Sequence, residues 1–240
     1  MNFDYERDTR GFYQNDDTAR RYHQMFMSPK GWRNLPSRLV ARRERRAIET
    51  LLDQVPHRTA LDLPAGTGKL AGIFAARGTR VVASDISASM LKLAEAEYAR
   101  AGCTDVRFQV EDATDLARFR EGSFDVVVCL RLMHRVPSGL RRRMLREFAR
   151  IAPCTIVSYG IETGFHKKRR ELRAAVFGGG RDPLCFCSVG QAHAELSADF
   201  EVLRQIWIAP ALSQEMVFLL RSRRDRAGVF GAADAPGSAP

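Results

Sequence analysis

A glycine-rich turn follows the first apolar strand that the sequence predicts. Residues 60–70 read ALDLPAGTGKL, a short apolar run followed by Gly66 and Gly68 and then by a helical pattern. Glycine lets the backbone approach a ligand closely, and the start of the next helix offers free N–H groups. The segment therefore predicts a nucleotide-binding turn.

The turn lacks the Walker pattern G-x-x-x-x-G-K-[ST], because leucine stands both five residues before Gly68 and directly after Lys69. ATP bound by that route is excluded. Residues 66–71 do match the dinucleotide pattern G-x-G-x-x-A, and Asp85 stands at the end of the next expected strand. Taken alone, this match is only a weak indication of a nicotinamide cofactor.

Acidic residues at three successive strand ends distinguish between these ligands. Asp62 would repel a pyrophosphate but would attract a cationic amino-acid group. Asp85 can accept both ribose hydroxyls, while Asp112 can accept from an adenine amino group and Ala113 can offer its N–H to a ring nitrogen. Glu111 adds a carboxylate beside Asp112. Singly, each acid is more often a cap or turn residue, but together with the glycine turn they favour a cationic, phosphate-free adenosine ligand.

Four segments in order resemble the motifs of class I S-adenosylmethionine-dependent methyltransferases: the turn 61–68, and segments 82–91, 108–113 and 124–130. The resemblance covers roughly residues 36–221 and implies S-adenosylmethionine as the cofactor. It implies cofactor contacts from Asp62, Pro64, Ala65, Gly66, Gly68, Asp85, Ile86, Met90, Glu111, Asp112, Ala113 and Leu130.

Pro64 departs from the family's usual D/E-x-G-x-G-x-G pattern, because it stands in place of the first glycine. Proline cannot take a positive φ and has no N–H to donate. We expect a tighter loop that leaves Gly66 and Gly68 unhindered. A non-catalytic protein that kept the fold is the alternative that this proline leaves open.

The acceptor side of the site is expected at residues 130–135, beyond the fourth strand. His134 is a candidate general base because histidine titrates near neutral pH, although it could equally orient the loop. Tyr159 and His166 are further catalytic candidates. No N/D-P-P-Y motif follows the fourth strand, which argues against DNA as the acceptor. The basic stretch 162–187 is expected to form an irregular insertion with the acceptor pocket. Its charge favours an anionic acceptor, although its lysines and arginines could equally face water.

The chain has 240 residues, 45% of them hydrophobic and 28% charged, which suits one α/β domain. It has no run of 18 apolar residues and its first residues are polar, so we expect a soluble, cytoplasmic protein. The five cysteines are scattered and odd in number, and we expect reduced thiols and no metal site.

Alternating strand and helix patterns predict a Rossmann-like, doubly wound α/β sheet of seven strands with helices on both faces. The short link 209–213 fits a hairpin, so the last strand should be antiparallel. Strands are expected at 60–63, 80–84, 106–110, 124–130, 155–159, 200–208 and 215–221, and helices at 36–54, 69–77, 88–101, 138–149 and 189–196. Ser87, Ser138 and Ser188 are the expected N-caps.

The methyltransferase domain is expected at residues 36–222. Residues 1–35 are rich in aromatic side chains and are expected to form a lid, in which Arg20 and Tyr22 close over the cofactor. Residues 223–240 are expected to be a disordered tail.

The formal charge of +10 attracts anions, but the basic clusters 42–46, 141–143 and 167–170 fall in separate expected helices. We favour solvated helix faces over nucleic-acid binding. The preferred function is methyl transfer to an oxygen or nitrogen atom of a small metabolite by a monomer or homodimer. Methylation of RNA or of a lipid headgroup stays an alternative, and a nicotinamide-dependent oxidoreductase is a distant one.

Overall fold

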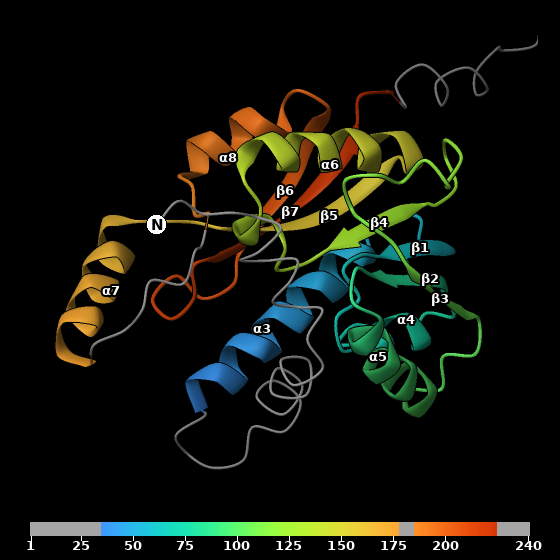
Figure 1. Cartoon of the computed structure of the whole chain (residues 1–240), viewed down its shortest axis with the longest axis horizontal. Coiled ribbons are helices and arrows are strands. Elements are labelled where there is room, and N and C mark those ends of the chain that lie inside the picture. Colours follow the sequence, from blue (N-terminus) through green and yellow to red (C-terminus); the bar gives the residue numbers. More distant parts are fainter. Residues whose placement is uncertain (1–34, 178–184, 225–240) are drawn as a thin grey trace, which may run out of the picture.

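The computed structural model of the chain describes residues 35–177 and 185–224. Seven strands form one sheet in the order β3-β2-β1-β4-β5-β7-β6 (Figure 1). They are β1 (Thr59–Asp62), β2 (Arg80–Asp85), β3 (Val106–Val110), β4 (Val126–Cys129), β5 (Cys154–Gly160), β6 (Phe200–Trp207) and β7 (Glu215–Ser222). The Rossmann-like sheet of seven strands is confirmed.

Strands β1 to β5 are parallel, whereas β7 is antiparallel to both β5 and β6. The antiparallel last strand is therefore also confirmed. The sheet differs from the 3-2-1-4-5-6 order of dinucleotide-binding folds, because β7 lies between β5 and β6. The strand order reverses between β1 and β4, and ligands of open α/β sheets bind beyond the carboxyl ends of the strands at such a point.

Helices cover both faces of the sheet (Figure 1). They are α3 (Leu35–Leu52), α4 (Ala71–Ala75), α5 (Ala88–Arg100), α6 (Ser138–Ile151), α7 (Gly164–Phe177) and α8 (Val189–Leu196), with a 3₁₀ turn η3 (Met133–Arg135). Side chains of α3, α4 and α5 share one buried core, and those of α6 and α8 share the other. Because β4 is buried along its whole length, as its apolar run predicts, both cores reach it.

Two of the three expected serine caps are confirmed. The Ser87 hydroxyl accepts an N–H from the first turn of α5, and Ser188 forms a capping box with Gln191 at α8. Ser138 was wrongly expected to cap α6. Pro137 holds that position without a side-chain hydrogen bond, and Ser138 is the first helical residue.

Three further expectations about helices are corrected. The helix expected at 69–77 is the five-residue α4, because the glycine turn continues past Lys69. The apolar residues at 39, 40, 48, 51 and 52 predict one apolar side for the helix expected at 36–54, but Leu39 is 42% exposed. Residues 162–187 are not simply irregular, since α7 occupies 164–177, where lysine, arginine, glutamate and alanine all favour helix.

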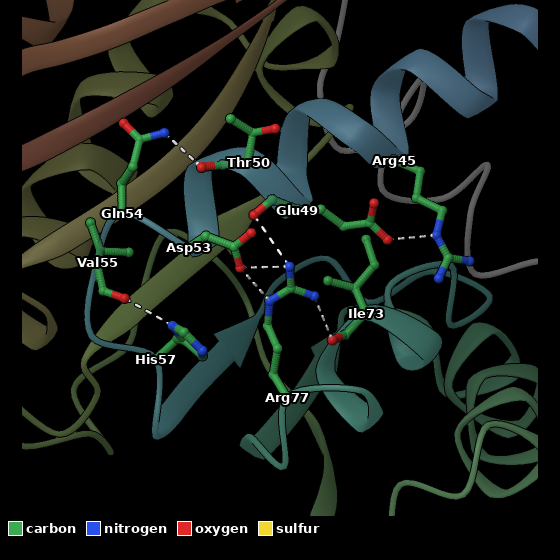
Figure 2. Close-up of polar contacts among 9 residues, drawn as sticks. All are labelled: Arg45, Glu49, Thr50, Asp53, Gln54, Val55, His57, Ile73 and Arg77. Carbon is green, nitrogen blue, oxygen red and sulfur yellow. Dashed lines mark hydrogen bonds and ion pairs between the residues drawn. The ribbon is translucent and has the colours of Figure 1, made fainter.

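Arg77 joins the end of α4 to the end of α3 (Figure 2). Its guanidinium donates to Asp53 Oδ1 from Nε at 3.0 Å and from Nη2 at 2.7 Å. Nη2 also reaches the Glu49 carbonyl oxygen at 3.3 Å, and Nη1 reaches that of Ile73 at 3.1 Å. These contacts fix α3 against the segment that carries the glycine turn.

The expected lid, with Arg20 and Tyr22, and most of the expected tail lie outside the described residues. Within 35–177 and 185–224, no helix has the length and apolar character needed to cross a membrane. The same residues contain no group of three or more histidine, cysteine or acidic side chains that could hold a metal ion.

Candidate functional site

The carboxyl ends of β1 and β2 bring two buried aspartates to one edge of the sheet. Asp62 ends β1 and is 2% exposed, and Asp85 ends β2 and is 4% exposed. Parallel pairing of β1 with β2 and of β2 with β3 places their ends, and Glu111 just beyond β3, along the same edge. The acidic residues at successive strand ends, which the sequence predicted, therefore lie along one edge of the sheet.

The glycine turn is held against β2 by backbone contacts. Ala65 N–H donates to the Ser84 carbonyl at 2.7 Å, and Gly66 N–H donates to Asp85 Oδ2 at 2.9 Å. Pro64 follows a cis peptide bond and does not prevent Gly66 and Gly68 from taking positive φ values of 55° and 80°. The expectation that proline leaves both glycines unhindered is confirmed.

The two glycines serve different purposes. A Cβ atom on Gly68 would lie 2.9 Å from Glu97 Cβ and 3.1 Å from Ala94 Cα, so close packing against α5 requires glycine there. A Cβ on Gly66 would meet nothing within 4 Å. The turn thus presents open space at Gly66, where a ligand can approach the backbone.

Among the described residues, Asp62 accepts a side-chain hydrogen bond from Tyr98 and forms no ion pair with a cation. Its Oδ2 accepts the Tyr98 hydroxyl at 2.7 Å. Burial raises the pKa of Asp62 to about 7; the Tyr98 hydrogen bond opposes this rise and the charge of Asp85 adds to it. A cationic group placed beside Asp62 would favour its ionised form, which fits the expected contact with an amino-acid ammonium.

Asp85 organises the backbone around it. Its two oxygens accept the N–H groups of Ser87 and Gly66, both at 2.9 Å. Burial raises its pKa to about 6, although these backbone hydrogen bonds oppose the rise. Because each carboxylate oxygen has two lone pairs, Asp85 keeps capacity to accept ribose hydroxyls. Ile86 and the buried Met90 follow it at the start of α5.

The acids after β3 are engaged in local contacts. Glu111 forms a 2.9 Å ion pair with Arg118. Asp112 Oδ1 accepts both the N–H and the hydroxyl of Thr114, at 2.8 and 2.7 Å, which closes an Asx-type turn. Both contacts use Oδ1, so Asp112 shapes the loop that carries the buried Ala113.

A cluster of charged side chains beyond β4 was missed by the sequence analysis. Arg131, directly after Leu130, has a positive φ of 59°, and its N–H donates to Ser158 Oγ at 2.7 Å. Its guanidinium donates two hydrogen bonds, of 2.8 and 2.6 Å, to the carboxylate of Glu44 on α3. Glu215, the first residue of β7, lies 3.5 Å from the same guanidinium.

The buried charged groups of this cluster shift one another's pKa values. Burial and Glu44 raise the pKa of Glu215 to about 7, while Arg131, Ser158 and Lys69 oppose the rise. Burial and Arg131 lower the pKa of Lys69 to about 8. Burial tends to raise the pKa of Glu44, but the charge and hydrogen bonds of Arg131, together with the charge of Lys69, outweigh it and lower the pKa. Lys69 after β1 and Arg131 after β4 thus place charge where the strand order reverses.

His134 lies in η3, beyond β4. Its ring stacks on Phe186 with centroids 6.1 Å apart. A Cβ on Gly160 would lie 2.5 Å from Phe186 and 2.8 Å from His134, so glycine at the end of β5 is what lets this pair approach. Burial, Arg135 and Arg131 lower the pKa of His134 to about 3, so its ring is neutral at pH 7 and is a weak base.

Tyr159 faces a different part of the molecule. It is 1% exposed, and its hydroxyl donates to Glu195 Oε2 of α8 at 3.2 Å. Arg141 stands 5.7 Å from the Tyr159 ring centroid and pairs with Glu195 at 2.7 and 2.6 Å. Burial and Glu195 raise the Tyr159 pKa, so this tyrosine contributes to packing between β5, α6 and α8. Arg141 also corrects the prediction that cluster 141–143 is wholly solvated, since it is 4% exposed.

His166 is buried on α7. Its Nδ1 lies 2.8 Å from the Thr163 hydroxyl oxygen. Burial and Arg169 lower its pKa, and a backbone contact with Pro210 opposes this. The Thr163 contact lies at the start of α7, so it orders the first turn of this helix and the buried His166 ring faces the protein. His193 of α8 has its Nε2 2.7 Å from the Gln205 side-chain oxygen of β6, so it joins these two elements.

The comparisons with known proteins agree with this geometry. Residues 60–153 match a family model described as a methyltransferase domain. The chain is 32% identical over 80 residues to a ubiquinone biosynthesis O-methyltransferase of Paracidovorax citrulli, covering 33% of this chain and 34% of that protein. It is 40% identical over 99 residues to a demethylmenaquinone methyltransferase of Clavibacter sepedonicus, covering 39% of each. The chain thus matches about a third of the length of these curated relatives.

A solved structure extends the likeness over most of the chain. The magnesium protoporphyrin IX methyltransferase of Synechocystis PCC 6803, with bound S-adenosylhomocysteine, covers 90% of this chain and all of its own, with a TM-score of 0.74 and 18% identity. That likeness shows the fold. The family match itself covers residues 60–153, from β1 to the residue before β5.

Proposed function

We propose that this chain transfers the methyl group of S-adenosylmethionine to an oxygen or nitrogen atom of a small metabolite. The observation that carries the proposal is the pair of buried aspartates beside an open glycine turn. Asp62 and Asp85 lie at neighbouring strand ends, and both have raised pKa values. Within the part of the chain that the structure describes, no cation is among the causes of either shift. A pyrophosphate would meet repulsion there, whereas a cationic nucleoside fits.

The residues present suit this cofactor. The carboxylates of Asp62 and Asp85 can accept hydrogen bonds from an ammonium group and from hydroxyls. Gly66 has no Cβ, so the space beside its backbone is open to the ligand. We assign Asp62 to the amino-acid ammonium, Asp85 to the ribose, and Asp112 with Ala113 to the adenine. When bound, S-adenosylmethionine supplies a methyl group on positively charged sulfur, so the protein chiefly needs to orient two ligands and exclude water.

We infer that the methyl acceptor binds beyond the carboxyl ends of β4 and β5. The stacked rings of His134 and Phe186 form an aromatic wall near Gly160, and Arg131 with Glu44 and Glu215 forms a charged wall. One curated relative is named an O-methyltransferase, which favours oxygen as the methylated atom. As part of the same proposal, the protein acts in the cytoplasm, as a monomer or homodimer, on a small molecule and not on nucleic acid.

Calorimetric titration of the full chain tests the cofactor assignment. S-adenosylhomocysteine should bind, and NADH should not. Asp85→Asn should weaken S-adenosylhomocysteine about tenfold to hundredfold if Asp85 holds the ribose. Asp105→Asn is the matched control, because Asp105 pairs with Arg80 on the exposed surface and should leave the affinity unchanged. Tight NADH binding without S-adenosylhomocysteine binding would contradict the proposal.

A further inference from the structure

Three of the six exposed large apolar side chains of the described residues lie on α7 and on the turn between β6 and β7. The large apolar residues exposed among those that the structure describes are Leu39, Val110, Phe165, Leu172, Leu203 and Leu212. Phe165 and Leu172 lie on α7 and are 59% and 65% exposed, the largest values of this set. Leu212, 39% exposed, lies in the turn between β6 and β7. Apolar side chains of this size grouped on one surface mark an interaction site.

A hydrogen bond joins the two segments. Arg169 Nη1 of α7 donates to the Ala211 carbonyl oxygen at 2.9 Å. His166 is 4% exposed, so its side of α7 faces the protein. Phe165 and Leu172 are seven residues apart, so they share one face two helical turns long. The inner face of α7 is thereby anchored while Phe165 and Leu172 point into solvent.

Positive charge borders the apolar face. Lys167, Lys168 and Arg169 are all exposed, and Lys168 lies between Phe165 and Leu172 on the same face. Figure 1 shows α7 set apart from the helices that cover the sheet. Because α7 begins four residues after Gly160, it is also near the end of the sheet where the acceptor is proposed to bind.

This combination fits the surface of an anionic lipid bilayer. Apolar side chains of such a helix enter the boundary between headgroups and acyl chains, while lysines remain at the phosphate level. Nucleic acid would match the charge but would leave Phe165 and Leu172 exposed to water. Charge complementarity together with exposed apolar area thus favours lipid over RNA.

We propose that α7 and the β6–β7 turn form a lipid-contact surface that seats this protein on anionic membranes. The consequence that the methyl acceptor is delivered from the membrane rests on the proposed function, but the membrane contact does not. The lipid-contact surface is defined by Phe165, Lys167, Lys168, Leu172 and Leu212.

Vesicle flotation of the full chain tests the surface directly. We expect the chain to bind vesicles of phosphatidylcholine with 30% phosphatidylglycerol about tenfold or more tightly than vesicles of pure phosphatidylcholine. High salt should weaken this binding. Phe165→Ser combined with Leu172→Ser, and Lys167→Glu combined with Lys168→Glu, should each weaken binding about tenfold or more. The matched control is Arg142→Glu with Arg143→Glu, the same charge change at exposed positions of α6.

The outcomes separate the surface from general charge and from the cofactor site. Equal loss of binding in the α6 control would overturn the proposal, as would binding to polyuridylic acid without binding to vesicles. Each variant should retain the wild-type melting temperature and S-adenosylhomocysteine affinity. A wild-type chain that binds S-adenosylhomocysteine but does not float refutes the lipid surface alone. One that floats but binds no S-adenosylhomocysteine refutes the cofactor assignment alone.

Discussion

The Tyr98 hydroxyl donates a 2.7 Å hydrogen bond to Asp62 across 36 residues of sequence. Tyr98 comes from α5 and is fully buried, with its ring packed edge-on against Phe108 at 5.6 Å between centroids. The contact ties α5 to the end of β1. The hydrogen bond also favours the ionised form of Asp62 and so opposes the rise in pKa that burial causes.

Removal of this hydroxyl should affect both stability and ligand binding. Tyr98→Phe keeps the ring but removes the hydrogen bond, so the free energy of unfolding should fall by about 1–2 kcal/mol in urea titrations. The Asp62 pKa should rise further, which weakens S-adenosylhomocysteine binding at pH 7. Tyr159→Phe also removes a buried hydroxyl, but one that contacts Glu195, and should leave that affinity unchanged. Equal effects of the two variants on affinity would contradict the assigned role of Asp62.

Cofactor affinity should increase with pH between about 5.5 and 7.5. The pKa values of about 7 for Asp62 and about 6 for Asp85 mean that both carboxyls lose protons in this range. Because the ligand's ammonium favours ionised carboxylates, binding should release protons. Titrations of S-adenosylhomocysteine in buffers with different ionisation enthalpies measure that release. In Asp62→Asn the upper part of the pH dependence should disappear, and its persistence would assign the proton to another group.

The same groups make stability depend on pH. Their folded-state pKa values lie above the ordinary 3.8, so between about pH 4 and 7 the folded chain holds protons that the unfolded chain has lost. The contribution of Asp62 to stability therefore falls as pH rises through this window. The difference in unfolding free energy between Asp62→Asn and the wild type should shift in favour of the variant from pH 4.5 to pH 7.5. A difference that does not vary with pH would show that Asp62 has an ordinary pKa.

Alanine at the two glycines should separate folding from binding. Gly68→Ala meets Glu97 and Ala94 of α5 and also adopts positive φ, so we expect a loss of about 2–4 kcal/mol of stability. Gly66→Ala has open space and should cost only about 1 kcal/mol from its backbone conformation. Its larger effect should be on S-adenosylhomocysteine affinity. Thermal unfolding and calorimetry measure the two effects, and a Gly66→Ala chain with wild-type affinity would place the ligand elsewhere.

The ion pair between Glu44 and Arg131 should matter more than other pairs on α3. Glu44→Gln removes the 2.6 Å ion pair and leaves Arg131 facing Glu215 at 3.5 Å, so we expect a loss of about 2 kcal/mol of stability. Glu49→Gln is the matched change on the same helix; it affects an exposed pair with Arg45 and should cost under about 0.5 kcal/mol (Figure 2). Urea titrations of both variants decide, and equal losses would show that Glu44 adds nothing beyond a surface charge.

The sequence alone determined the sheet, the antiparallel last strand and the position of the glycine turn. These follow from local patterns: the apolar run of β4, the short link before β7, and the order of Gly66, Gly68 and Asp85. Each signal lies within a few residues of the feature it specifies, so no knowledge of long-range contacts was needed.

Tertiary structure alone decided which side chains meet. Glu44 belongs to a run of arginines that reads as a solvated helix face, yet it contacts Arg131 87 residues away. Tyr159 looked like a catalytic phenol, but contact with Glu195 makes it part of the core. Burial and pairing depend on how distant elements pack, and in the interior a charge or hydroxyl takes its chemical role from those neighbours rather than from its place in the chain.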